Sequence, residues 1–86
     1  MTIYRRTMEI SNKELSNGQW EIFNKKNIEF IALALRSDKW TSIDNLSKDI
    51  GLYRKAHKEP EITQEEIIVA LESLILYDMA ECKESE

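Results

Sequence analysis

The chain has few of the residues on which catalytic and metal sites depend. Its 86 residues include one cysteine (Cys82), one histidine (His57), two glycines and one proline. A single cysteine excludes an intramolecular disulfide, and two glycines are too few for a glycine-rich phosphate-binding loop. His57 stands in a polar segment without the second histidine or nearby cysteine that a zinc site needs. The sequence therefore predicts a protein that is not an enzyme and that has no cofactor and no metal.

Long apolar runs are also missing. Residues 1–10 lack the apolar core of a signal peptide, and no run is long enough to cross a bilayer. Together with the single cysteine, these absences favour a cytoplasmic protein that does not contact a membrane. The length predicts one domain over residues 1–86, and we expect its charged tail, residues 83–86, to fray.

Charge is divided unevenly along the chain, which has a net charge of −4. Residues 59–86 contain nine acidic and one basic side chain, whereas residues 1–58 contain seven acidic and eleven basic ones. Two solvated faces of opposite sign account for this division. The alternative is a dipolar surface that steers a charged partner.

The N-terminal third has the pattern of an antiparallel sheet. Asn17-Gly18 is a strong hairpin signal, because a type I′ turn needs residues that tolerate positive φ. Alternation of apolar and polar residues surrounds this dipeptide, and Arg6 on the apolar side favours an edge position for the first strand. The expected strands are residues 3–10, 13–16 and 19–23.

The remainder has the apolar spacing of three helices. Thr41 with Asp44, and Thr63 with Glu66, resemble capping boxes at two helix starts. Gly51 is placed to end the middle helix, and we expect a loop from there to residue 61. The expected helices are residues 25–36, 41–51 and 63–77. The predicted fold class is α+β and winged-helix-like: an N-terminal three-stranded antiparallel sheet followed by three helices.

The last of these helices is more apolar than a domain of this size can cover. Its core stripe contains Ile67, Leu71, Leu74 and Ile75. Outside the stripe, the candidates for a partner surface are Val69, Leu76 and Tyr77. The segment has acidic residues and no Lys or Arg, which argues against nucleic-acid binding, since a duplex would be repelled.

Three segments together resemble the PqqD-like family, the winged-helix peptide-recognition domains of ribosomal-peptide modification pathways. Gly18-Gln19-Trp20-Glu21-Ile22-Phe23-Asn24 is similar to the family's Gly-x-aromatic-x-x-Leu-Asn. The segment from Trp40 to Leu46 is similar to its Thr-Val-x-Glu-Ile stretch. The family's final-helix pattern, Val-x-x-x-Leu-x-x-Leu, is matched by Ile67, Leu71 and Leu74. The likeness covers about residues 3–82.

The resemblance implies a function. Such domains bind the leader of a precursor peptide as an added strand on the third strand, and they deliver it to a separate modifying enzyme or protease. Arg54, Lys55 and Lys58 would then interact with an acidic leader. The peptide-binding residues implied are Gln19, Trp20, Glu21, Ile22, Phe23, Leu71, Leu74 and Tyr77.

Two other functions fit the sequence. A winged helix is also the fold of many DNA-binding transcriptional regulators, which would use the last two helices as a helix-turn-helix. The acidic C-terminal part is alternatively suited to a small subunit or inhibitor of a larger protein.

Overall fold

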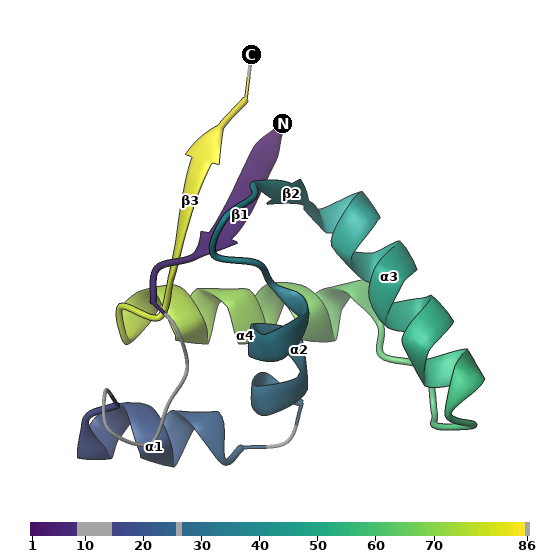
Figure 1. Ribbon diagram of the computed structural model, residues 1–86, viewed down its shortest axis with the longest axis horizontal. Helices are drawn as coiled ribbons and strands as arrows, with labels where there is room; N and C mark the ends of the chain where they lie inside the picture. The colour runs from purple at the N-terminus through teal and green to yellow at the C-terminus, as the bar shows by residue number, and fades with distance from the viewer. Residues whose placement is uncertain (9–14, 26, 86) are drawn as a thin grey trace.

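The computed structural model describes residues 1–8, 15–25 and 27–85 (Figure 1). This part of the chain contains three strands and four helices, so the fold is α+β as predicted, with one helix more than expected. The elements in chain order are β1 (Thr2–Arg6), α1 (Asn17–Phe23), α2 (Ile28–Ala34), β2 (Thr41–Ser42), α3 (Ile43–Ala56), α4 (Gln64–Leu76) and β3 (Ala80–Glu84).

The sheet joins segments that lie far apart in the sequence. Its strand order is β2-β1-β3, and both pairings are antiparallel. All five residues of β1 pair with β3, from Thr2 opposite Glu84 to Arg6 opposite Ala80. The N-terminal meander expected from the sequence is therefore wrong. The tail expected to fray instead supplies Lys83 and Glu84 to a strand.

Strand β1 is the central strand and not an edge. Arg6, which suggested an edge, is accommodated because its Nη1 donates to the carbonyl of Ala32 (3.3 Å). Its backbone N–H donates to the carbonyl of Arg36 (2.9 Å). Tyr4 and Met8 pack against the core. Residues 9 and 10 of the expected first strand lie outside the described residues.

Residues 19–23 form helix α1, so the prediction of a third strand there is wrong. Ser16 is the N-cap: its Oγ accepts from the N–H of Gln19 (3.2 Å), and Gln19 Oε1 accepts from the N–H of Ser16 (3.0 Å). This reciprocal capping box replaces the expected hairpin, and Gly18 does not have a positive φ. Of the expected second strand, residues 13 and 14 lie outside the described residues, and Leu15 is buried.

The other helices follow the sequence more closely. Ser42, one residue after the expected Thr41, caps α3 and accepts from the N–H of Asn45 (3.2 Å). Helix α3 continues through Gly51 to Ala56, so half of the expected loop is helical. Thr63 caps α4 by accepting from the N–H of Glu66 (3.1 Å), so the predicted N-cap is confirmed. The Glu66 carboxylate accepts from Asn27 Nδ2 (3.2 Å) and does not complete the capping box expected with Thr63.

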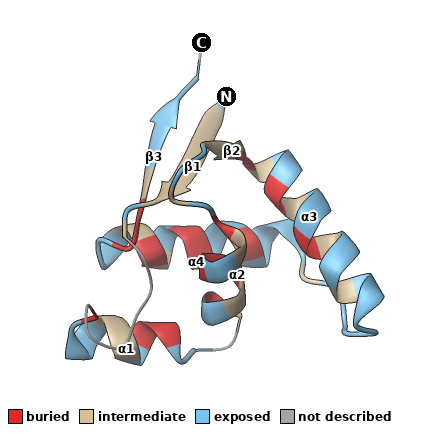
Figure 2. Ribbon diagram, in the orientation of Figure 1, coloured by how far each residue is buried: buried red, intermediate tan, exposed pale blue. Residues whose placement is uncertain are grey.

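The core lies between the helices and the inner face of the sheet. Buried positions occur on all four helices and at the start of β3 (Figure 2). Full burial of an aliphatic side chain contributes about 1.5–3 kcal/mol, so these positions dominate stability. The largest fully buried side chains are Ile31, Leu35, Leu46, Ile50, Ile67, Leu71, Leu74 and Met79.

A substitution at Gly18 tests the correction from hairpin to helix. In α1, alanine at this position meets only ordinary contact, with its Cβ 3.7 Å from Tyr77 Cε1. Because glycine is a poor helix residue, we expect Gly18→Ala to raise the free energy of unfolding by roughly 0.5 kcal/mol in a urea titration.

A type I′ turn would give the opposite sign, since alanine is strained at positive φ. Ser16→Ala is the companion variant. We expect it to lower stability by about 1 kcal/mol through loss of the cap.

Candidate functional site

Half of the sequence-predicted site residues lie in the core. Ile22, Phe23, Leu71 and Leu74 are between 1% and 6% exposed, so their side chains do not reach a partner. Trp20 is half-buried and packs edge-on against Phe23, with ring centroids 5.7 Å apart. Glu21 is exposed on α1.

The structure does bring two of the predicted residues together. Gln19 Nε2 donates to the backbone carbonyl of Tyr77 (2.7 Å). The ring of Tyr77 lies beside Gly18. These contacts attach α1 to the C-terminal end of α4. Because residues 19–23 are helical, the third strand of the sheet is β3 and not this segment.

One side of β3 is open. The N–H of Ser85 donates to the carbonyl of Met1 (2.7 Å), and the N–H of Thr7 donates to the carbonyl of Met79 (3.2 Å). Both bonds fit the β1–β3 register, in which hydrogen-bonded and non-hydrogen-bonded pairs alternate. Because Met1 and Ser85 form a bonded pair, the pairs of Cys82 with Tyr4 and of Glu84 with Thr2 are the non-hydrogen-bonded ones. The backbone groups of Cys82 and Glu84 consequently point away from β1. Within the described residues, no backbone hydrogen bond joins this outer edge to another segment.

Side-chain contacts on the outer face of the sheet, the face opposite to Tyr4, attach β3 to its neighbours. The Arg5 guanidinium lies 4.4 Å from the ring centroid of Trp40, and Lys83 Nζ lies 4.4 Å from the same centroid. Arg5 Nε also donates to Glu81 Oε1 (2.8 Å). Two cation–π contacts and an ion pair therefore link β1, β3 and the segment before β2. Sequence reasoning missed this group because it depends on the pairing of distant strands.

The inner face of the sheet is acidic where it meets α4. Burial raises the pKa of the Tyr4 phenol, and the nearby Cys82, Glu72 and Glu84 raise it further. Tyr4 pairs with Cys82 across the strands, and Cys82 is an exposed free thiol. A segment added to β3 would place alternate side chains on this face.

Helix α4 carries a second exposed surface. Val69 and Leu76 are 60% and 78% exposed, as the sequence predicts. Together with Glu65 and Glu72 they occupy positions i, i+4, i+7 and i+11, which form one row along a helix. We call this set the α4 row. It contains two carboxylates and two large apolar side chains.

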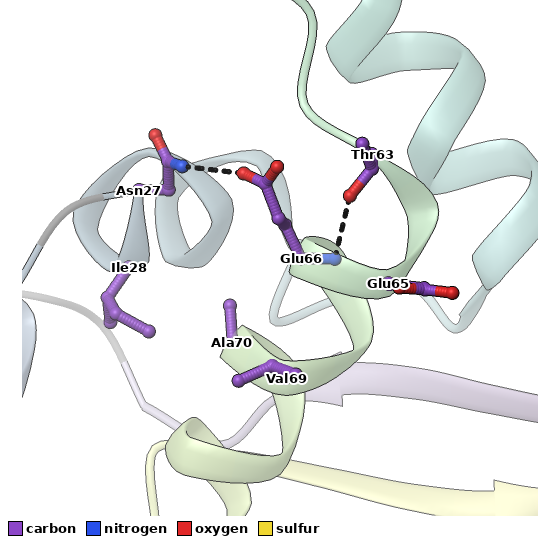
Figure 3. A pocket seen from close by; sticks show the side chains of 7 residues that line it. All are labelled: Asn27, Ile28, Thr63, Glu65, Glu66, Val69 and Ala70. Carbon is purple, nitrogen blue, oxygen red and sulfur yellow. Dashed lines mark hydrogen bonds between the residues drawn. The ribbon is translucent and has the colours of Figure 1, made fainter.

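A groove of about 630 Å³ lies beside the N-terminal half of the α4 row (Figure 3). One edge is formed by a hydrogen bond from Asn27 Nδ2 to Glu66 Oε2 (3.2 Å). Ile28, Val69 and Ala70 make its apolar part. The lining residues are Asn27, Ile28, Thr63, Glu65, Glu66, Val69 and Ala70.

The basic residues expected to contact a peptide lie elsewhere. Arg54 belongs to α3; it donates to Asn27 Oδ1 (2.8 Å) and Glu59 Oε2 (2.7 Å) and lies over the Phe30 ring. It therefore ties α3 to the start of α2. This end of α3 lies on the opposite side of the molecule from β3 (Figure 1), so these cations do not adjoin the open edge.

The described residues contain no group of three or more His, Cys, Asp or Glu that could hold a metal ion. None of the helices described is long and apolar enough to cross a membrane. Comparisons of the chain with protein-family models, curated proteins and solved structures found no match.

The raised pKa of Tyr4 predicts a change of stability at high pH. The unfolded phenol loses its proton near pH 10, whereas the folded one keeps it to a higher pH. The free energy of unfolding is therefore unaffected by this group below about pH 10 and falls as the pH rises above it.

Tyr4→Phe should remove the part of this loss of unfolding free energy that comes from ionisation of the phenol. The measurement is urea unfolding of the original and variant proteins from pH 8 to 11. Parallel curves for the two proteins above pH 10 would contradict the assignment.

Proposed function

We propose that this chain is a non-catalytic binding module that takes an extended peptide as a fourth strand on the outer edge of β3. The observation that carries this proposal is the outward direction of the backbone groups of Cys82 and Glu84. In strand addition, main-chain hydrogen bonds supply the affinity, and pockets for alternate side chains supply the specificity.

Three features support this use of β3. The strand is paired over its full length with β1, so its edge is ordered before a peptide arrives. The contacts of Arg5 and Lys83 with Trp40 hold it from the outer face. The inner face offers Tyr4 and Cys82 to alternate side chains of the added strand. Pre-ordering lowers the entropic cost of binding.

We further propose a winged-helix-like arrangement in which α2, α3 and α4 are the three helices and α1 is additional. The ligand we propose is the leader of a precursor peptide, delivered in the cytoplasm to a modifying enzyme or protease. This part rests on the resemblance to PqqD-like domains. The DNA-binding alternative is disfavoured, because the exposed face of α4 is acidic and apolar.

Proline substitutions test the open edge directly. Cys82→Pro removes an N–H that points outward, which an edge strand tolerates. We expect it to fold and to weaken binding of a peptide selected from a displayed peptide library at least about tenfold, since an added strand loses a hydrogen bond and is blocked sterically. Titration calorimetry measures the change.

Two variants serve as controls. Cys82→Val keeps the N–H and changes only the side chain, so it should weaken binding much less than Cys82→Pro does. Lys83→Pro removes an N–H that points toward β1 and should lower stability, which circular dichroism detects. Equal affinity of Cys82→Pro and Cys82→Val for every selected peptide would refute strand addition at this edge.

A further inference from the structure

We propose that the α4 row and the adjoining groove bind a basic amphipathic helix of a partner protein. This surface is made of α4 side chains and not of the backbone edge of β3, and the proposal does not depend on strand addition. It rests on the spacing, exposure and charge of Glu65, Val69, Glu72 and Leu76.

The spacing of the row suits a helix. Val69 and Leu76 are seven residues apart, or about 10 Å along the helix axis at 1.5 Å per residue. A partner helix that lies along α4 repeats its own side chains at the same seven-residue interval. Between its ends, a helix uses its backbone N–H and C=O groups in its own hydrogen bonds, so a partner that lies along α4 must be recognised through side chains.

The charge of the row defines the partner further. Glu65 and Glu72 flank Val69, and within the described residues neither carboxylate forms an ion pair. Residues 64–76 contain no Lys or Arg. Lys or Arg side chains on the partner would complement both carboxylates and would speed association.

The groove supplies an apolar contact at one end of the row. Ile28 and Ala70 are buried at its base, while Val69 and Glu65 stand at its margin. An aliphatic side chain from the partner helix would enter beside Val69, with a neighbouring cation near Glu65. At the other end, Leu76 is 78% exposed and would pack against the next apolar residue of the partner. Burial of these side chains would supply most of the affinity.

The probe for this surface is a synthetic helical peptide with leucine at heptad a and d positions and lysine at the flanking positions. The same peptide with glutamate in place of lysine is the charge control. We expect the basic peptide to bind the full chain and the acidic peptide not to bind, as measured by fluorescence anisotropy at low and high salt. Binding of both peptides with equal affinity would overturn the charge argument.

Variants at exposed positions place the binding on α4. We expect Val69→Ser/Leu76→Ser to weaken binding at least about tenfold, and Glu65→Gln/Glu72→Gln to weaken it several-fold and to flatten its salt dependence. Leu52→Ser on α3 and Glu29→Gln on α2 are matched controls, since Leu52 is 60% exposed and Glu29 is exposed. Both should bind like the original protein.

Three results would overturn the proposal. The first is an unchanged affinity in both α4 double variants. The second is an equal loss of affinity in Leu52→Ser. The third is that the original protein forms a dimer that does not bind the basic peptide, and that Val69→Ser/Leu76→Ser dissociates this dimer. The α4 row would then be covered by a second copy of the chain. Sedimentation velocity detects that dimer.

Discussion

The pairing of β1 with β3 is the interaction on which the rest of the structure depends. It joins residues that are 82 positions apart, such as Thr2 and Glu84. This pairing makes β1 the central strand, with β2 on its other side, and brings Lys83 over the ring of Trp40. Because β3 follows α4 after a short turn, the same pairing fixes that helix against the sheet. The direct consequence is an edge strand whose outward backbone groups have no partner strand among the described residues.

The two proposed surfaces use different chemistry. The edge of β3 offers backbone hydrogen-bonding groups, which recognise an extended chain of almost any sequence. The α4 row offers side chains alone, two acidic and two apolar, and so selects a partner by charge and apolar spacing. The edge of β3 is available because β3 is the last strand of the sheet, and the α4 row is available because α4 uses only one side for the core. Ile67, Leu71 and Leu74 fill that side, while Val69 and Leu76 remain outside.

Local signals in the sequence located α2, α3 and α4, whereas they predicted a strand in place of α1 and paired the wrong strands in the sheet. The cap at Thr63 and the core stripe of α4 were predictable because capping and 3.6-residue periodicity act within a few residues. Asn17-Gly18 suggested a hairpin, but the capping box of Ser16 and Gln19 favours a helix. Strand β3 was missed because its polar sequence has little strand character and is stabilised by a distant partner. The exposure of Val69 and Leu76 followed from the pattern, whereas the open edge could not be foreseen without β3.

Amide hydrogen exchange across β3, read residue by residue by NMR, tests whether this strand pairs with β1 and leaves its outer edge open. We expect slow exchange at Glu81 and Lys83, whose N–H groups point toward β1. We expect fast exchange at Cys82 and Glu84, whose N–H groups point outward. Uniformly fast exchange at all four amides would show that β3 is not paired. Equally slow exchange at all four would show that its outer edge is already covered, and either result would contradict an ordered, open edge at β3.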